Sequence, residues 1–192
     1  MPAVNYLTSV SVVLLYSWFF VAFLQSSGVV TMGTIRIPLG WLIVNILIFT
    51  FLLFLYFSFI FKLPGLNYIV IFTSIYMFVF NLVFMYDLYA KSLIYNRMEH
   101  LVGSFILAFL IYTLTSLVPS LGANGLLVRF SIVIIFTVFI LSLGEIVELG
   151  LDYFFHEKNI GPGLWDTNLD LLMDLIGSSF FVLLSWLAGI FA

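Results

Sequence analysis

Six long apolar segments constrain this chain more than any other feature. They are separated by short breaks rich in Gly, Pro and polar residues, and they cover residues 6–24, 39–61, 66–86, 101–118, 126–149 and 169–191. A helix needs about 20 apolar residues to cross the hydrocarbon core of a bilayer, and a helix satisfies its own backbone hydrogen bonds inside lipid. The sequence therefore predicts an all-α fold, a polytopic transmembrane bundle of about six helices forming a single domain over residues 1–192.

Composition excludes several classes of protein. Hydrophobic residues make up 64% of the chain and charged residues only 8%, whereas a soluble domain has about 25% charged residues. The absence of cysteine excludes disulfides, thiolate metal sites and cysteine nucleophiles. No basic patch suggests a nucleic-acid partner. The expected surroundings are membrane lipids, in a protein integral to the cell membrane.

The charged residues are distributed unevenly between the two sides of the membrane. If the segments cross in alternation, residues 25–38, 87–98 and 150–165 lie on one side, with four of the six basic residues. The positive-inside rule places that side in the cytoplasm. All nine acidic residues lie at or near the same side, and so do His100 and His156. We therefore expect a functional site at the cytoplasmic face.

Two rows of carboxylates stand out at the end of the fifth segment and the start of the sixth. The rows are Glu145, Glu148 and Asp152, spaced i, i+3, i+7, and Asp166, Asp170 and Asp174, spaced i, i+4, i+8. Each spacing places its row on one helix face, and consecutive spans are antiparallel. If the two faces meet, Asp152 pairs with Asp166, Glu148 with Asp170, and Glu145 with Asp174.

Six unpaired carboxylates at that spacing need compensation, because each one costs free energy to remove from water. Arg97 and His100, one turn apart at the start of the fourth span, can point into the same groove, but they are too few to balance the row. Carboxylates with one histidine suit Mg²⁺, Mn²⁺, Fe²⁺ or Zn²⁺. The predicted metal ligands are His100, Glu145, Glu148, Asp152, Asp166, Asp170 and Asp174. The predicted catalytic residues are His100, Glu148 and Asp170, with Arg97 and Glu99 as further site residues.

Other interpretations of the same residues stay open. The acid rows also suit a path for protons or cations, or a structural hydrogen-bonded network. His100 can simply pair with a carboxylate, and Glu99 can belong to the membrane surface. Asp166 can serve only as the cap of the sixth helix.

The polar sequences around these residues resemble a known family. They are Arg97-Met98-Glu99-His100-Leu101-Val102-Gly103, Gly144-Glu145-Ile146-Val147-Glu148, and Asp166-Thr167-Asn168-Leu169-Asp170 continuing through Asp174 to Gly177. This set resembles the YjdF-like family of small multi-pass membrane proteins and, more distantly, the VanZ-like group. The resemblance covers roughly the C-terminal half of the chain. It implies that these residues form one site, and it implies no particular activity.

The leading hypothesis from the sequence is a metal-dependent membrane protein, a hydrolase or transferase, acting on a lipid or lipid-phosphate at the cytoplasmic leaflet. A proton or cation transporter or channel is the first alternative. The second is a non-catalytic subunit of a larger membrane complex. The apolar surface also permits a homo-oligomer.

Overall fold

The structure is a computed structural model that describes residues 2–29, 39–60, 62–63, 65–85, 93–118, 125–155 and 164–188, with backbone alone at several helix ends. Across these residues the chain forms helices and no strand. The helices are α1 (Pro2–Ser26), α2 (Leu39–Phe59), α3 (Gly65–Met85), α5 (Leu93–Thr115), α7 (Leu126–Phe155) and α8 (Leu164–Leu187). All except α3 contain an apolar stretch long enough to cross a membrane, and α3 has a shorter one at Gly65–Asn81. The predicted all-α, polytopic fold is confirmed.

Helices α5, α7 and α8 extend beyond their predicted spans at the ends that contain acidic residues. Helix α5 begins at Leu93 rather than Leu101, and α8 begins at Leu164 rather than Leu169. Helix α7 continues to Phe155 instead of ending at Leu149. Hydropathy marks the part of a helix that lies in hydrocarbon, and polar residues can continue the same helix beyond that part. These extensions carry the residues of the candidate site.

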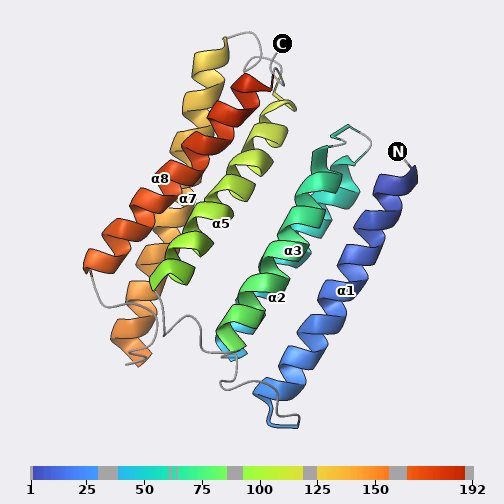
Figure 1. Ribbon diagram of the computed structural model, residues 1–192, viewed down its shortest axis with the longest axis vertical. Coiled ribbons are helices and arrows are strands. Elements are labelled where there is room, and N and C mark those ends of the chain that lie inside the picture. Colours follow the sequence, from blue (N-terminus) through green and yellow to red (C-terminus); the bar gives the residue numbers. More distant parts are fainter. Residues whose placement is uncertain are drawn as a thin grey trace. The chain divides into compact units, whose positions relative to one another are not determined.

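The chain divides into two compact units, Met1–Tyr95 and Asn96–Ala192, and each is described by itself. In the first unit, α1 packs mainly along α3, and α2 contacts both (Figure 1). Asn67 joins all three helices, because its Oδ1 accepts hydrogen bonds from Thr8 Oγ1 and Tyr56 OH, each at 3.0 Å. The rings of Tyr16, Phe19 and Phe49 pack between α1 and α2.

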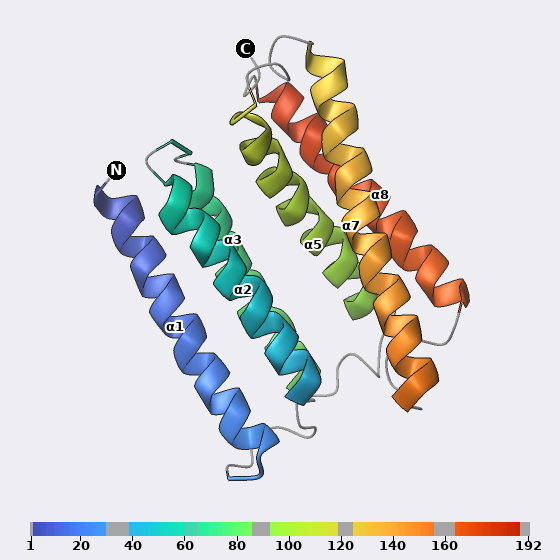
Figure 2. The ribbon, with the colours of Figure 1, turned by 180° about the vertical axis from the view of Figure 1, so that it is seen from behind.

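The second unit consists of α5, α7 and α8, which lie side by side in both ribbon views (Figures 1 and 2). Its apolar core is formed by the buried residues Ala108, Val133 and Phe181, one from each helix. Phe109 stacks on Phe181 with ring centroids 5.6 Å apart, and Phe105 meets the same ring edge-on at 5.4 Å. Aromatic packing therefore joins α5 to α8 in the half of the unit that contains no acidic residue.

Helix α5 and helix α8 approach most closely at Gly177. A Cβ atom at this position would lie far inside van der Waals contact with Ser104 Oγ and the Leu101 carbonyl oxygen. Only glycine allows the two backbones to approach this closely, as at many helix contacts in membranes. Because Asp174 is one turn before Gly177, this contact holds the Asp174 side chain against α5.

Arg129 stabilises the opposite end of α5. Its Nε donates to Thr115 Oγ1 at 2.8 Å and its Nη2 donates to the Tyr112 carbonyl at 3.1 Å. Its guanidinium also lies 3.9 Å from the centre of the Tyr112 ring. Carbonyls in the last turn of a helix lack intrahelical donors and attract cations, so this basic residue has a structural role.

Candidate functional site

The acidic row of α8 faces α5. Arg97 forms ion pairs with Asp166 through Nη2 and with Asp170 through Nη1. Asn96 Nδ2 donates to Asp170 Oδ1 and Oδ2 at 3.2 and 3.1 Å. One turn further along α5, His100 Nδ1 lies 3.2 Å from Asp174 Oδ1. Three aspartates are thus matched, turn by turn, by polar residues in the first two turns of α5.

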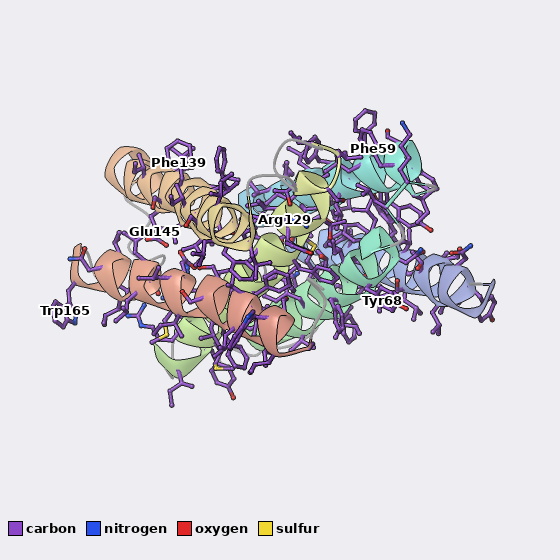
Figure 3. All side chains as sticks on the ribbon, turned by 90° about the horizontal axis from the view of Figure 1, so that it is seen from above. Phe59, Tyr68, Arg129, Phe139, Glu145 and Trp165 are labelled. Carbon is purple, nitrogen blue, oxygen red and sulfur yellow. The ribbon has the colours of Figure 1, made fainter. Side chains whose placement is uncertain are left out.

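Helix α7 contributes Glu145 to the same cluster. Its Oε1 lies 3.5 Å from His100 Nε2, and Asp170 Oδ1 lies 3.7 Å from the same nitrogen. Figure 3 shows Glu145 on the side of α7 that faces α8, with Phe139 and Trp165 on outer sides of their helices. His100 is therefore the residue at which all three helices meet.

The cluster is almost completely removed from solvent. The side chain of Asp174 is 0% exposed, and its Oδ2 atom has no hydrogen-bond partner among the described residues. The side chains of Asp166 and Asp170 are each 5% exposed and that of Glu145 is 6% exposed. Arg97 and His100 are slightly more open, at 14% and 16%. A buried carboxylate oxygen without a hydrogen bond costs free energy, so Asp174 has the strongest need in the site for a compensating cation or proton.

The described charges of the cluster do not balance. Four carboxyl groups face one guanidinium and one imidazole, so at least two negative charges stay uncompensated if every carboxyl is ionised. The ligand atoms of His100, Glu145 and Asp170 all lie within 4.8 Å of one another. One nitrogen and two oxygens at this spacing need only small shifts to contact a single divalent cation.

The contacts bear on only part of the predicted pairing of the two rows, because the side chains of Glu148 and Asp152 lie outside the described residues. We expected Glu145 opposite Asp174, and both contact the imidazole of His100, Glu145 at Nε2 together with Asp170 and Asp174 at Nδ1. The prediction assumed that the two acid rows face each other directly. In the structure the α8 row contacts Arg97 and His100 on α5, because opposite charges attract.

The comparison with protein families covers almost the whole chain. The family model described as "Predicted membrane protein (DUF2238)" matches residues 7–189. The chain belongs to the DUF2238 family. No curated protein and no solved structure matches it. The family match includes the first three apolar spans as well as the acid rows, whereas the resemblance in the polar sequences covers only the C-terminal half.

Several predicted site residues of this DUF2238 chain lie outside the described residues or outside the cluster. The side chains of Glu148 and Asp152, near the end of α7, are outside the described residues, and so is all of His156. Glu99 is partly exposed on α5, next to His100 in the sequence. Asp166 lies inside the first turn of α8 rather than before it, so it is not the helix cap.

Sequence reasoning missed Asn96. Its side chain is buried and donates to both oxygens of Asp170, but a single Asn in a segment read as a loop gave no signal. The signal that could have found it is position. Asn96 is one turn before His100 and next to Arg97, so once the helix is extended to Leu93 it lies on the same face.

Beyond Asp174 the unit of this DUF2238 chain becomes apolar. The buried hydroxyls of Ser104, Ser178 and Thr137 all donate to carbonyls of their own helices. The next layer is the Ala108, Val133 and Phe181 core. Among the described residues of α5, α7 and α8, no acidic group continues the row toward the other side.

Proposed function

We propose that this DUF2238 chain binds a divalent metal ion through His100, Glu145 and Asp170 and uses it to act on a lipid or lipid-phosphate at the cytoplasmic leaflet. The observation that carries the proposal is the position of His100. Its Nδ1 bonds to the fully buried Asp174, while its Nε2 is directed toward Glu145 and Asp170.

This arrangement matches the usual chemistry of a metal-bound histidine. Such a histidine donates its second ring N–H to a carboxylate, which fixes the tautomer and presents the other nitrogen to the metal. In this interpretation Asp174 orients the ring and His100 Nε2 is the ligand. Mg²⁺, Mn²⁺, Fe²⁺ and Zn²⁺ remain the proposed ions, because one nitrogen with carboxylate oxygens is compatible with each of them.

Three protein ligands leave coordination positions for water and substrate. A metal at this place polarises a phosphoryl or carbonyl oxygen, or lowers the pKa of a bound water so that it becomes a nucleophile. We keep Glu148 as a proposed catalytic residue and ligand and Asp152 as a proposed additional ligand, because both continue the row that begins with Glu145.

The depth of the site favours a lipid headgroup as substrate. Trp165, at the start of α8, is 74% exposed, and tryptophan concentrates at the membrane–water interface. Asp166 follows immediately, and Asp174 lies roughly 12 Å deeper at the helical rise per residue. These positions support a cluster that begins at headgroup depth, and the positive-inside bias of the sequence favours the cytoplasmic face.

The alternatives have less support. A proton or cation path through α5, α7 and α8 needs polar groups beyond Asp174, where the apolar core lies instead. A role as a subunit of a larger complex or of a homo-oligomer is compatible with the exposed apolar surface, but lipid accounts for that surface equally well. A relationship to the YjdF-like and VanZ-like groups rests on the polar sequences quoted above and stays a proposal.

Metal content tests the proposal. The purified protein is dialysed against Mg²⁺, Mn²⁺, Fe²⁺ or Zn²⁺ and its bound metal is measured by mass spectrometry. We expect stoichiometric metal in the wild type and in His156→Ala, the matched control, and loss to background in His100→Ala and Glu145→Gln. A wild type that retains none of the four ions would contradict the metal site.

The lipid chemistry needs a separate assay. The metal-loaded protein is incubated with phospholipid nanodiscs, and lipid products and free phosphate are followed over time. Turnover that disappears in Asp170→Asn supports catalysis on a lipid. A metal-loaded protein that leaves every phospholipid class unchanged rules out this half of the proposal and leaves the metal site intact.

A further inference from the structure

Asp170 has two competing cationic partners in the proposed metal-bound state. Its Oδ1 atom is the acceptor for Arg97 Nη1 and Asn96 Nδ2, and the same atom lies 3.7 Å from His100 Nε2. A metal ion between His100, Glu145 and Asp170 would therefore use the oxygen that Arg97 now contacts. Two cations on one carboxylate oxygen repel each other, so metal binding and the Arg97–Asp170 ion pair oppose one another.

Arg97 does not lose its position if it releases Asp170. Its Nη2 stays paired with Asp166 in the first turn of α8. A guanidinium has five N–H donors in a planar fork, a geometry that suits two phosphate oxygens at once. The Arg97 side chain is 14% exposed whereas Asp174 is 0% exposed, so Arg97 lies on the open side of the cluster.

We infer that Arg97 binds the phosphate of the substrate, exchanging Asp170 for a phosphate oxygen when the metal takes Asp170. This inference rests on the proposed metal site and goes beyond it, because it selects an unblocked phosphate, as in phosphatidate, over the choline-blocked phosphodiester of phosphatidylcholine. A phosphate would bridge the guanidinium and an open position of the metal. Metal and phosphate would then strengthen each other's binding by the same factor, as linkage requires.

Mn²⁺ binding measures this coupling. The Mn²⁺ affinity of the protein is determined by electron paramagnetic resonance in nanodiscs of phosphatidylcholine, of phosphatidylcholine with phosphatidate, and of phosphatidylcholine with inorganic phosphate in solution. We expect phosphatidate to raise the Mn²⁺ affinity of both the wild type and Arg97→Gln, because the discs become negatively charged. The increase should be about fivefold or more larger in the wild type than in the variant. Coupling with inorganic phosphate as well would indicate a soluble phosphate compound, and coupling with phosphatidate alone a lipid headgroup.

Arg97→Gln separates the two effects of the guanidinium. In phosphatidylcholine discs this variant should bind Mn²⁺ more tightly than the wild type, because the competitor for Asp170 is gone. With phosphatidate the Mn²⁺ affinity of this variant should rise only slightly, because the negative disc surface attracts Mn²⁺ but no guanidinium is present to bind the phosphate. Lys62→Gln, which removes a cation from the exposed connection between α2 and α3, is the matched control and should behave as the wild type does.

Two further variants keep the test decisive if Arg97→Gln does not fold. Arg97→Lys keeps the charge but loses the planar fork, so the phosphate coupling should fall. Asn96→Ala removes a neutral donor from Asp170, so Mn²⁺ should bind at least as tightly and the phosphate coupling should persist.

Equal phosphate effects in the wild type and the Arg97 variants would overturn the inference while leaving the metal site standing. Weaker Mn²⁺ binding by Arg97→Gln in phosphatidylcholine would overturn it too, because Arg97 would then support the metal ligand rather than compete with it. Absence of Mn²⁺ binding, together with no bound metal in the dialysis experiment, would instead reject the proposed function itself.

Discussion

At the scale of single residues, Asp174 and His100 form the unit from which the site is built. Asp174 lies at zero exposure with one oxygen on His100 and the other without a hydrogen-bond partner among the described residues. Such a position is unfavourable for a carboxyl group unless a neighbouring cation or proton compensates. In the proposed function, Asp174 supports the metal through the imidazole ring without touching it.

Replacing Asp174 tests this positioning role. Asp174→Asn retains the size of the side chain but removes its charge, so His100 should be a weaker and less well-oriented ligand. We expect the metal affinity to fall about 10- to 100-fold, measured by competition with a metal-sensitive dye. Ser178→Ala is the control, because the Ser178 hydroxyl only donates to carbonyls of its own helix. A normal metal affinity in Asp174→Asn would exclude the role.

The sequence predicted which residues gather but not how they pair. His100, Arg97, Glu145 and the three aspartates of α8 were expected in one groove, and their side chains do meet. The partners could not be predicted, because spacing along one helix fixes a face and leaves the rotation and depth of its neighbours open. Asn96 was missed for the same reason, because its role in the cluster is to hydrogen bond to Asp170 and that contact depends on where Asp170 lies.

At the scale of helices, the contact between α5 and α8 determines the geometry of the site. Gly177 allows α8 to approach Leu101 and Ser104, and the Phe105, Phe109 and Phe181 rings continue the contact along the helices. Arg97 and His100 can reach the aspartates of α8 only if this separation is kept.

Gly177→Ala should therefore affect stability and metal binding together. The added Cβ would meet the Leu101 carbonyl, which is backbone and cannot move alone. Overpacking of this kind costs about 1–3 kcal/mol, measurable by thermal unfolding in detergent, and the metal affinity should fall as the helices separate. Gly144→Ala is the matched control, because a Cβ there meets nothing within 4 Å. Equal stability of the two variants would contradict the close contact.

Helix number and type followed from hydropathy, but the helix ends did not. The starts of α5 and α8 and the end of α7 contain Asn, Arg, Glu and Asp, which a search for apolar runs excludes. At the start of α5, Arg97 has partners on α8 in Asp166 and Asp170. Such tertiary contacts favour the longer helix and cannot be read from hydropathy.

At the scale of the whole molecule, the family match over residues 7–189 includes both compact units. The family description, a predicted membrane protein, agrees with the polytopic all-α character that composition and segment length predicted. The division into two units was not predicted, because apolar segments of similar composition give no indication of which helices pack together.

The orientation of the molecule can be measured directly, since the chain contains no cysteine. Lys62 and Trp165 are both exposed. The predicted alternation of spans puts them on opposite sides of the membrane, and the positive-inside rule assigns Trp165 to the cytoplasm. In intact cells a membrane-impermeant maleimide should label Lys62→Cys and not Trp165→Cys, with both labelled after lysis. The reverse pattern would move the candidate site to the outer face.

The apolar layer of Ala108, Val133 and Phe181 beneath the acid cluster has a consequence for the exchange of ions. In the proposed function, an ion bound near Asp174 would have this apolar layer of α5, α7 and α8 between it and the other side of the unit, and it would exchange with the solution on the side of Arg97. Loading of the cluster would then depend on the ion concentration on that side, and an ion gradient across the bilayer would not drive it.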